Sequence, residues 1–77
     1  MNFVKIIEQS IGSKINDETI CFRVEVNDFK DYFRRYEQAK EFYFQSRTLG
    51  KDVKMFIEYQ RLGSSKDCDF LINFIED

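Results

Sequence analysis

The stretch FKDYFRRYEQAKEFYFQS, residues 29–46, holds seven of the thirteen aromatic side chains of this 77-residue chain. A chain this short buries only roughly 60–65% of the surface that it exposes when unfolded, so its core is small. Each aromatic ring buries a large apolar area, so the core must lie wherever these rings pack. The conformation of this stretch therefore constrains the fold more than any other feature.

At about 100° per residue, six of these aromatic residues fall on an arc of roughly 120° of a helix. They are Phe29, Tyr32, Phe33, Tyr36, Tyr43 and Phe44. The spacing predicts one long helix with an aromatic face packed on a small sheet, and Asp28 can cap its start. Phe42 falls on the polar side of this helix, close to Leu49.

Two segments, Thr19–Val26 and Val53–Leu62, alternate apolar and polar residues and predict strands with one buried face. The residues expected to point inward are Ile20, Phe22, Val24 and Val26 in the first, and Val53, Met55, Ile57 and Tyr59 in the second. Phe56 is the apolar exception on the outward side. Asn27-Asp28 ends the first strand.

The two ends of the chain are less regular. Phe3–Ile11 has helical spacing, with Asn2 as a possible N-cap. Asp67–Ile75 fits either a strand or a helix that Ser64 or Ser65 caps. We expect a strand, because two strands joined only by a crossover are rarely stable.

These elements predict one α+β domain, residues 1–77, in the order α-β-α-β-β. One long aromatic-faced helix would pack on a three-stranded sheet. The first two strands would be parallel, with a right-handed crossover through the helix, and the last two would form an antiparallel hairpin at 63–65.

The chain has no histidine, which excludes Ser-His-Asp and Cys-His catalysis, and it lacks the glycine-rich phosphate-binding motifs. We read Asp67 and Asp69 as solvated turn residues. Cys21 and Cys68 predict two reduced core residues, or a disulfide if their strands are neighbours. The sequence thus predicts no catalytic residue, no metal site and no cofactor. No apolar run could span a bilayer, so we expect a cytoplasmic protein that does not bind membranes.

The net charge of −2 is unevenly distributed. Seven basic and four acidic residues lie between positions 30 and 54, whereas the rest has five basic and ten acidic residues. This pattern fits either ordinary solvated faces or a dipolar surface that orients a charged partner.

Phe42 beside Leu49 predicts a second contact surface, a protein-binding or homodimer site with Arg34, Arg35 and Gln38 as its rim. Alternatively, the first helix packs there, or the long helix ends early. The main rival is nucleic-acid binding on the outward sheet face. Its candidate residues are Arg23, Lys54 and Phe56, but Glu25 and Glu58 share that face and oppose phosphate.

The segment YEQAKEFYFQSRTLGKDVKMFIEYQ, residues 36–60, resembles a helix-then-strand module of small phage-encoded proteins, including some anti-CRISPR inhibitors. The resemblance covers about a third of the chain and carries over no functional residue. The absence of catalytic motifs in so short a chain predicts a small non-enzymatic protein-binding module, and the resemblance suggests a phage or mobile-element inhibitor that occludes a host protein.

Overall fold

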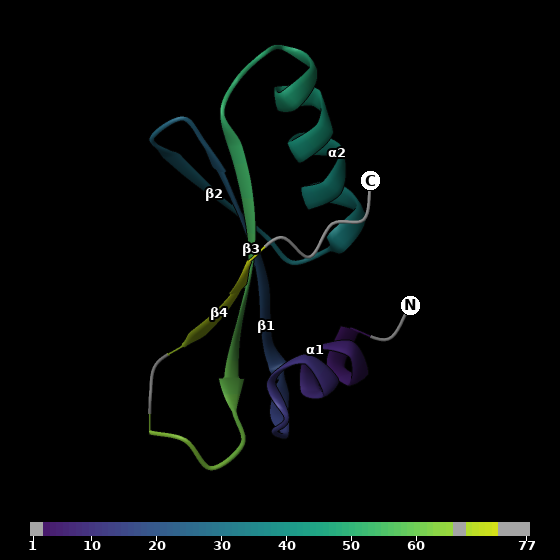
Figure 1. The fold of residues 1–77 in the computed structure, drawn as a ribbon, viewed down its shortest axis with the longest axis vertical. Coiled ribbons are helices and arrows are strands. Elements are labelled where there is room, and N and C mark those ends of the chain that lie inside the picture. The colour runs from purple at the N-terminus through teal and green to yellow at the C-terminus, as the bar shows by residue number, and fades with distance from the viewer. Residues whose placement is uncertain (1–2, 66–67, 73–77) are drawn as a thin grey trace.

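The computed structural model describes residues 3–65 and 68–72, and at positions 71 and 72 only the backbone. Two helices and an antiparallel four-stranded sheet make up this part of the chain, so the predicted α+β class is confirmed (Figure 1). The elements in order are α1 (Phe3–Ile11), β1 (Ile15–Val26), β2 (Phe29–Phe33), α2 (Tyr36–Thr48), β3 (Val53–Arg61) and β4 (Asp69–Ile72).

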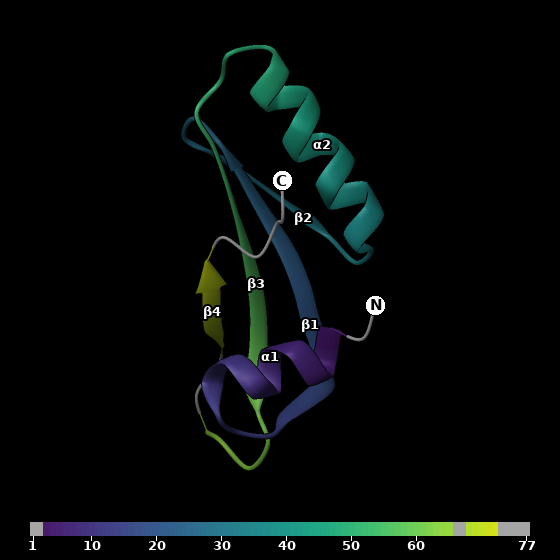
Figure 2. The ribbon, with the colours of Figure 1, turned by 45° about the vertical axis from the view of Figure 1, so that its right-hand side comes forward.

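The sheet has the strand order β2-β1-β3-β4. Both helices lie on the same side of it, α2 over the end near the β1–β2 turn and α1 over the opposite end (Figures 1 and 2). The chain therefore runs twice through an α-β-β unit. The first strands of the two units, β1 and β3, pair in the centre, and their second strands, β2 and β4, form the edges.

The predicted order with three strands is wrong because it omits β2. The strands β1 and β3 were expected to be parallel, but they pair antiparallel. The physical reason is simple: each element reverses the chain direction, so one additional strand before α2 inverts the direction of everything after it. The helix crossover between parallel strands is therefore absent.

Three of the aromatic residues assigned to a helix face, Phe29, Tyr32 and Phe33, lie in β2. Asn27 and Asp28 form a two-residue connection between β1 and β2, with Asn27 at a φ of 54°. Asparagine tolerates this left-handed conformation better than most residues do, which suits it to a tight hairpin. Asp28 therefore does not cap a helix; Arg35 holds the N-cap position of α2, without a side-chain cap bond.

The prediction that Phe42 is excluded from the core is also wrong. Since α2 begins only at Tyr36, its packed face differs from the expected one: Ala39 and Ser46 are buried. Phe42 is half-buried against the core, with its ring centroid 5.5 Å from that of Phe33. Phe42 therefore packs within the molecule, but against Phe33 of β2, a strand that the sequence-based alternatives for this residue did not include.

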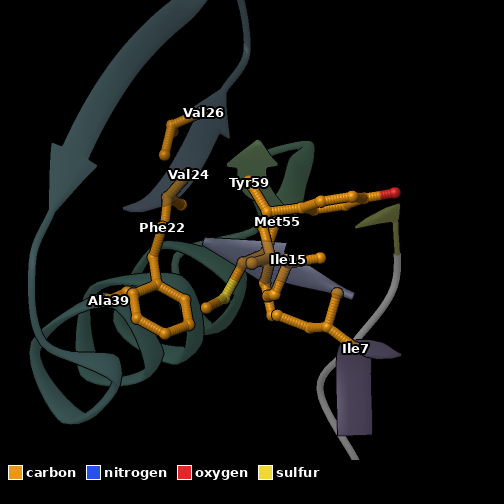
Figure 3. Close-up of a cluster of buried hydrophobic side chains, with 9 residues drawn as sticks. Ile7, Ile15, Phe22, Val24, Val26, Ala39, Met55 and Tyr59 are labelled. Carbon is orange, nitrogen blue, oxygen red and sulfur yellow. The ribbon is translucent and has the colours of Figure 1, made fainter. Parts of the chain in front are cut away.

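The inward faces of the two central strands are confirmed. The core contains Phe22, Val24 and Val26 of β1 with Met55, Ile57 and Tyr59 of β3, and Ile15 lies beside them. Ile7 of α1 and Ala39 of α2 close this core from the helix side (Figure 3). The helix Phe3–Ile11 has the predicted ends, whereas its proposed cap, Asn2, lies outside the described residues.

The last strand, β4, falls within the predicted segment Asp67–Ile75 and pairs antiparallel with β3, as expected. The helical alternative for 69–72 is wrong; positions 67 and 73–75 lie outside the described residues. Because β3 separates Cys21 from the start of β4, about two strand spacings, or roughly 10 Å, lie between the two cysteines. A disulfide allows at most about 7 Å between Cα atoms, so these two cannot form one. Both are half-buried, not core, residues.

Candidate functional site

The two sides of the sheet differ in what covers them. Both helices pack on one side, and no described helix packs on the other, which we call the open face (Figure 2). The register of the strands assigns its residues, since directly paired residues point to the same side. They include Lys30 and Tyr32 of β2, Cys21, Arg23 and Glu25 of β1, Lys54, Phe56 and Glu58 of β3, and Phe70 of β4.

An arginine at the centre of the open face is enclosed by four neighbours. The guanidinium carbon of Arg23 lies 4.4 Å from the ring centroid of Phe56 and 4.6 Å from that of Phe70. One guanidinium nitrogen, Nη1, donates a hydrogen bond of 2.9 Å to Glu58 Oε1. Its Nε lies 3.1 Å from Glu25 Oε2, and because this N–H makes no hydrogen bond, the contact is an ion pair alone. We call these five residues the arginine cluster.

The three charged side chains of the arginine cluster are largely withdrawn from water, although no helix among the described residues covers them. Only 12% of the Arg23 side chain is exposed, against 24% for Glu25 and 16% for Glu58. Removing charges from water is costly unless they are paired, and here two carboxylates and two aromatic faces surround one cation. With both glutamates charged, the cluster carries one net negative charge. Its side chains are packed against one another without any partner present.

More exposed side chains form the rim of the open face, and one of them, Phe70, also belongs to the arginine cluster. Tyr32 of β2, the cross-strand neighbour of Arg23, is 56% exposed, and Phe70 is 50% exposed. Lys30 and Lys54 are both exposed and lie on either side of Glu25 in the register. The open face thus has a packed centre and an amphipathic edge.

The residues predicted for nucleic-acid binding, Arg23, Lys54 and Phe56, do come together on this face. The Arg23 guanidinium is engaged by the two carboxylates, however, and Phe56 lies under it. Only Lys54 of the three has an exposed charge. The arrangement therefore presents less positive charge than the sequence pattern indicated.

The residues predicted for protein binding do not form one surface. Arg34 and Arg35 precede α2 and Leu49 follows it, so at 1.5 Å per residue about 20 Å of helix separates them. The two arginines line an open groove of about 840 Å³ between α2, α1 and the start of β1, with Val4 and Ile20 among its apolar residues.

At the other end of the helix, Leu49 is 72% exposed and shares a shallow hollow with Phe44. Gln38 is exposed near the arginines, whereas Phe42 faces the core.

Sequence reasoning missed Tyr32 and Phe70 as members of the outward face. The signal for Tyr32 was the two-residue turn at Asn27-Asp28, which predicts a hairpin and so places residue 32 opposite residue 23. Phe70 could be assigned only through the register of β4 with β3. Glu25 and Glu58 were correctly placed on this face, but as obstacles to phosphate and not as partners of Arg23.

The described residues lack two features that other functions would need. No helix there is long and apolar enough to cross a membrane. No group of three or more His, Cys, Asp or Glu side chains in the same part of the chain could hold a metal ion.

Comparisons with protein-family models, with curated proteins and with solved structures find no match for this chain.

Proposed function

We propose that this protein is a small non-enzymatic module that binds another protein through the open face of its sheet. The arginine cluster carries the proposal. Arginine and aromatic residues are the types most enriched where binding energy concentrates in protein interfaces. A side chain that is already fixed loses little conformational entropy on binding, so a preassembled centre favours affinity.

The rim supports the same function. Tyr32 and Phe70 expose half or more of their surface next to the packed centre. Such residues supply apolar contact area, and the tyrosine hydroxyl can also pair with a polar group of a partner. The open face thus combines a largely dehydrated middle with an accessible border, as interfaces do.

An inhibitor that occludes a host protein is the form of this function that the resemblance of residues 36–60 suggests. The helix-then-strand unit of that resemblance corresponds to α2 and β3. Occlusion needs a rigid surface and no catalytic group, which agrees with a chain that lacks histidine and the common phosphate-binding motifs.

Binding of single-stranded nucleic acid on the same face is the second candidate. Lys30 and Lys54 favour it, since both are exposed beside aromatic side chains. Glu25 and Glu58 oppose it, because phosphate contacts need a clear positive excess. The first candidate is therefore preferred.

Affinity capture from a lysate of the native host tests the proposal. The bait would be the wild type, Tyr32→Ser and Phe70→Ser, with Leu62→Ser as the matched control. Leu62 is 67% exposed but lies in the β3–β4 turn. We expect one protein to be captured by the wild type and the control and lost from both open-face variants.

Capture that all four baits share, or that the Leu62 variant loses equally, would refute the open face as the site. Binding of a labelled single-stranded oligonucleotide at low salt, lost in Lys54→Glu, would favour the second candidate.

A further inference from the structure

The outer edge of β2 has backbone groups that a strand of a partner protein could bind. β2 pairs with β1 on one side, and no described strand pairs with it on the other. In an antiparallel sheet, alternate residues of an edge strand direct their N–H and C=O groups away from the neighbouring strand. Four of the five residues of β2 are exposed. This edge is therefore a template on which a further strand could form.

The side chains of β2 form two rows. Lys30 and Tyr32 lie on the open face, opposite Glu25 and Arg23 of β1. Phe29, Asp31 and Phe33 lie on the helix side of the sheet. Each row thus combines a charge with aromatic surface, and the two charges have opposite sign.

Neither charge of β2 is neutralised within the described residues. Glu25, across from Lys30, is paired with Arg23, and Asp31 lies across from the apolar Val24. Both Lys30 and Asp31 are exposed and take part in no ion pair of the described chain. A strand added at this edge would bring its own side chains directly beside them.

A second copy of this chain is a poor occupant. Antiparallel pairing of two β2 strands about a twofold axis keeps both sets of helices on one side, so residues of the same row must face each other. Centred on position 30 or 31, it opposes Lys30 to Lys30 or Asp31 to Asp31. Centred on 32, it opposes Lys30 to Arg34. Like charges directly opposite are destabilising in each of these registers, and a register centred on 29 or 33 overlaps the two β2 strands at one residue only.

We propose that β2 binds an extended strand of the partner protein by strand addition. The partner strand carries an acidic residue opposite Lys30, a basic residue opposite Asp31 and apolar residues opposite Phe29, Tyr32 and Phe33. This mode rests on the protein-binding function proposed above, and it places Tyr32 where the added strand meets the open face. Backbone hydrogen bonds supply affinity, and the two charges supply direction and selectivity.

Two synthetic peptides of identical composition test this mode. The matched peptide, acetyl-Thr-Val-Ile-Lys-Glu-Val-Thr-amide, places Lys opposite Asp31 and Glu opposite Lys30 when it runs antiparallel to β2. The control peptide exchanges its Lys and Glu. Each is titrated into the ¹⁵N-labelled wild type and into the double variant Lys30→Glu/Asp31→Lys, with amide chemical shifts as the readout.

We expect saturable shifts at residues 29–33 with the matched peptide, and binding weaker by roughly tenfold with the control peptide, because two attractive cross-strand pairs become repulsive. The double variant should reverse this preference, which a merely structural effect of the substitutions would not do.

Equal affinity for both peptides, shifts elsewhere in the molecule, or no saturable shift up to millimolar peptide would overturn strand addition; the two charges would then only keep the edge from pairing. A concentration-dependent dimer of the unliganded wild type that the double variant lacks would also overturn it, in favour of a second copy. If the peptides show no such binding but capture of the partner still depends on Tyr32 and Phe70, the protein-binding function is supported and only strand addition is refuted. If the Tyr32 and Phe70 variants capture the partner as well as the wild type does, the proposed function itself is refuted.

Discussion

The two faces of the sheet are built from alternate residues of the same strands, yet they exclude water in different ways. On the helix side, apolar side chains such as Val24 and Ile57 are covered by α1 and α2. On the open face, the arginine cluster withdraws charges from water by pairing them with each other and with aromatic rings. The first solution needs a second layer of structure, whereas the second withdraws charges from water on a face that no described helix covers.

The largest effect should come from the helix side. Ile57→Ala removes a fully buried side chain, and we expect it to lower the free energy of unfolding by about 2–5 kcal/mol. Urea denaturation followed by circular dichroism measures this. Lys54→Ala, on the same strand but exposed on the open face, is the control and should change it by less than about 0.5 kcal/mol. Similar losses in both variants would mean that the two faces do not differ as described.

The next effect should come from the centre of the open face. Arg23→Ala leaves Glu25 and Glu58 without their counter-charge, and we expect a loss of about 1–3 kcal/mol of unfolding free energy. Adding Glu58→Ala should recover part of this loss, because the unpaired carboxylate is then removed too. Strictly additive losses in this double-mutant cycle would contradict a coupled cluster.

A smaller effect should distinguish the two ends of α2. Phe42→Ala removes a half-buried ring that contacts Phe33, so we expect a loss of about 1–2 kcal/mol. Leu49→Ala, at the exposed end of the helix, should cost less than about 0.5 kcal/mol. Thermal and urea unfolding of the two variants side by side would decide this. An unchanged stability for Phe42→Ala would restore the sequence-based hypothesis of a contact residue.

The smallest effect on stability should come from the rim. Tyr32→Ser changes a side chain that is more than half exposed, so the unfolding free energy should stay within about 0.5 kcal/mol of the wild type. The same variant should nevertheless lose the captured partner. A clear loss of stability would show that Tyr32 belongs to the packed centre instead.

How much of this fold the sequence reveals depends on how many patterns fit each segment. Phe3–Ile11 fits only a helix, and the central parts of β1 and β3 fit only strands, so their buried faces were predicted correctly. Residues 29–36 fit two patterns. Their aromatic residues recur at helical spacing, but they also follow a two-residue turn that favours a hairpin. Pairing with β1 decides between these patterns, and no local property of FKDYF contains that information.

The candidate site was harder to predict for the same reason. A single missing strand changed which residues meet across the sheet, and it gave Phe42 the wrong surroundings. Arg23 and Phe56 were recognised as outward neighbours because both lie on strands that the alternation defines. The contact between Arg23 and Phe70 depends on the register of β4 with β3, which the sequence does not specify.

The twofold α-β-β arrangement also bears on the order of events during folding. Each unit can close its own hairpin early, because the strands within a unit are near in sequence. Joining β1 to β3 instead requires a long chain loop to close, a step that costs more entropy and that we expect to limit the folding rate. Arg23 and Glu58 come from these two strands, so the arginine cluster assembles only in that late step. A partly folded chain would therefore not display the arginine cluster, so under the proposed function only molecules that have completed the fold could bind a partner.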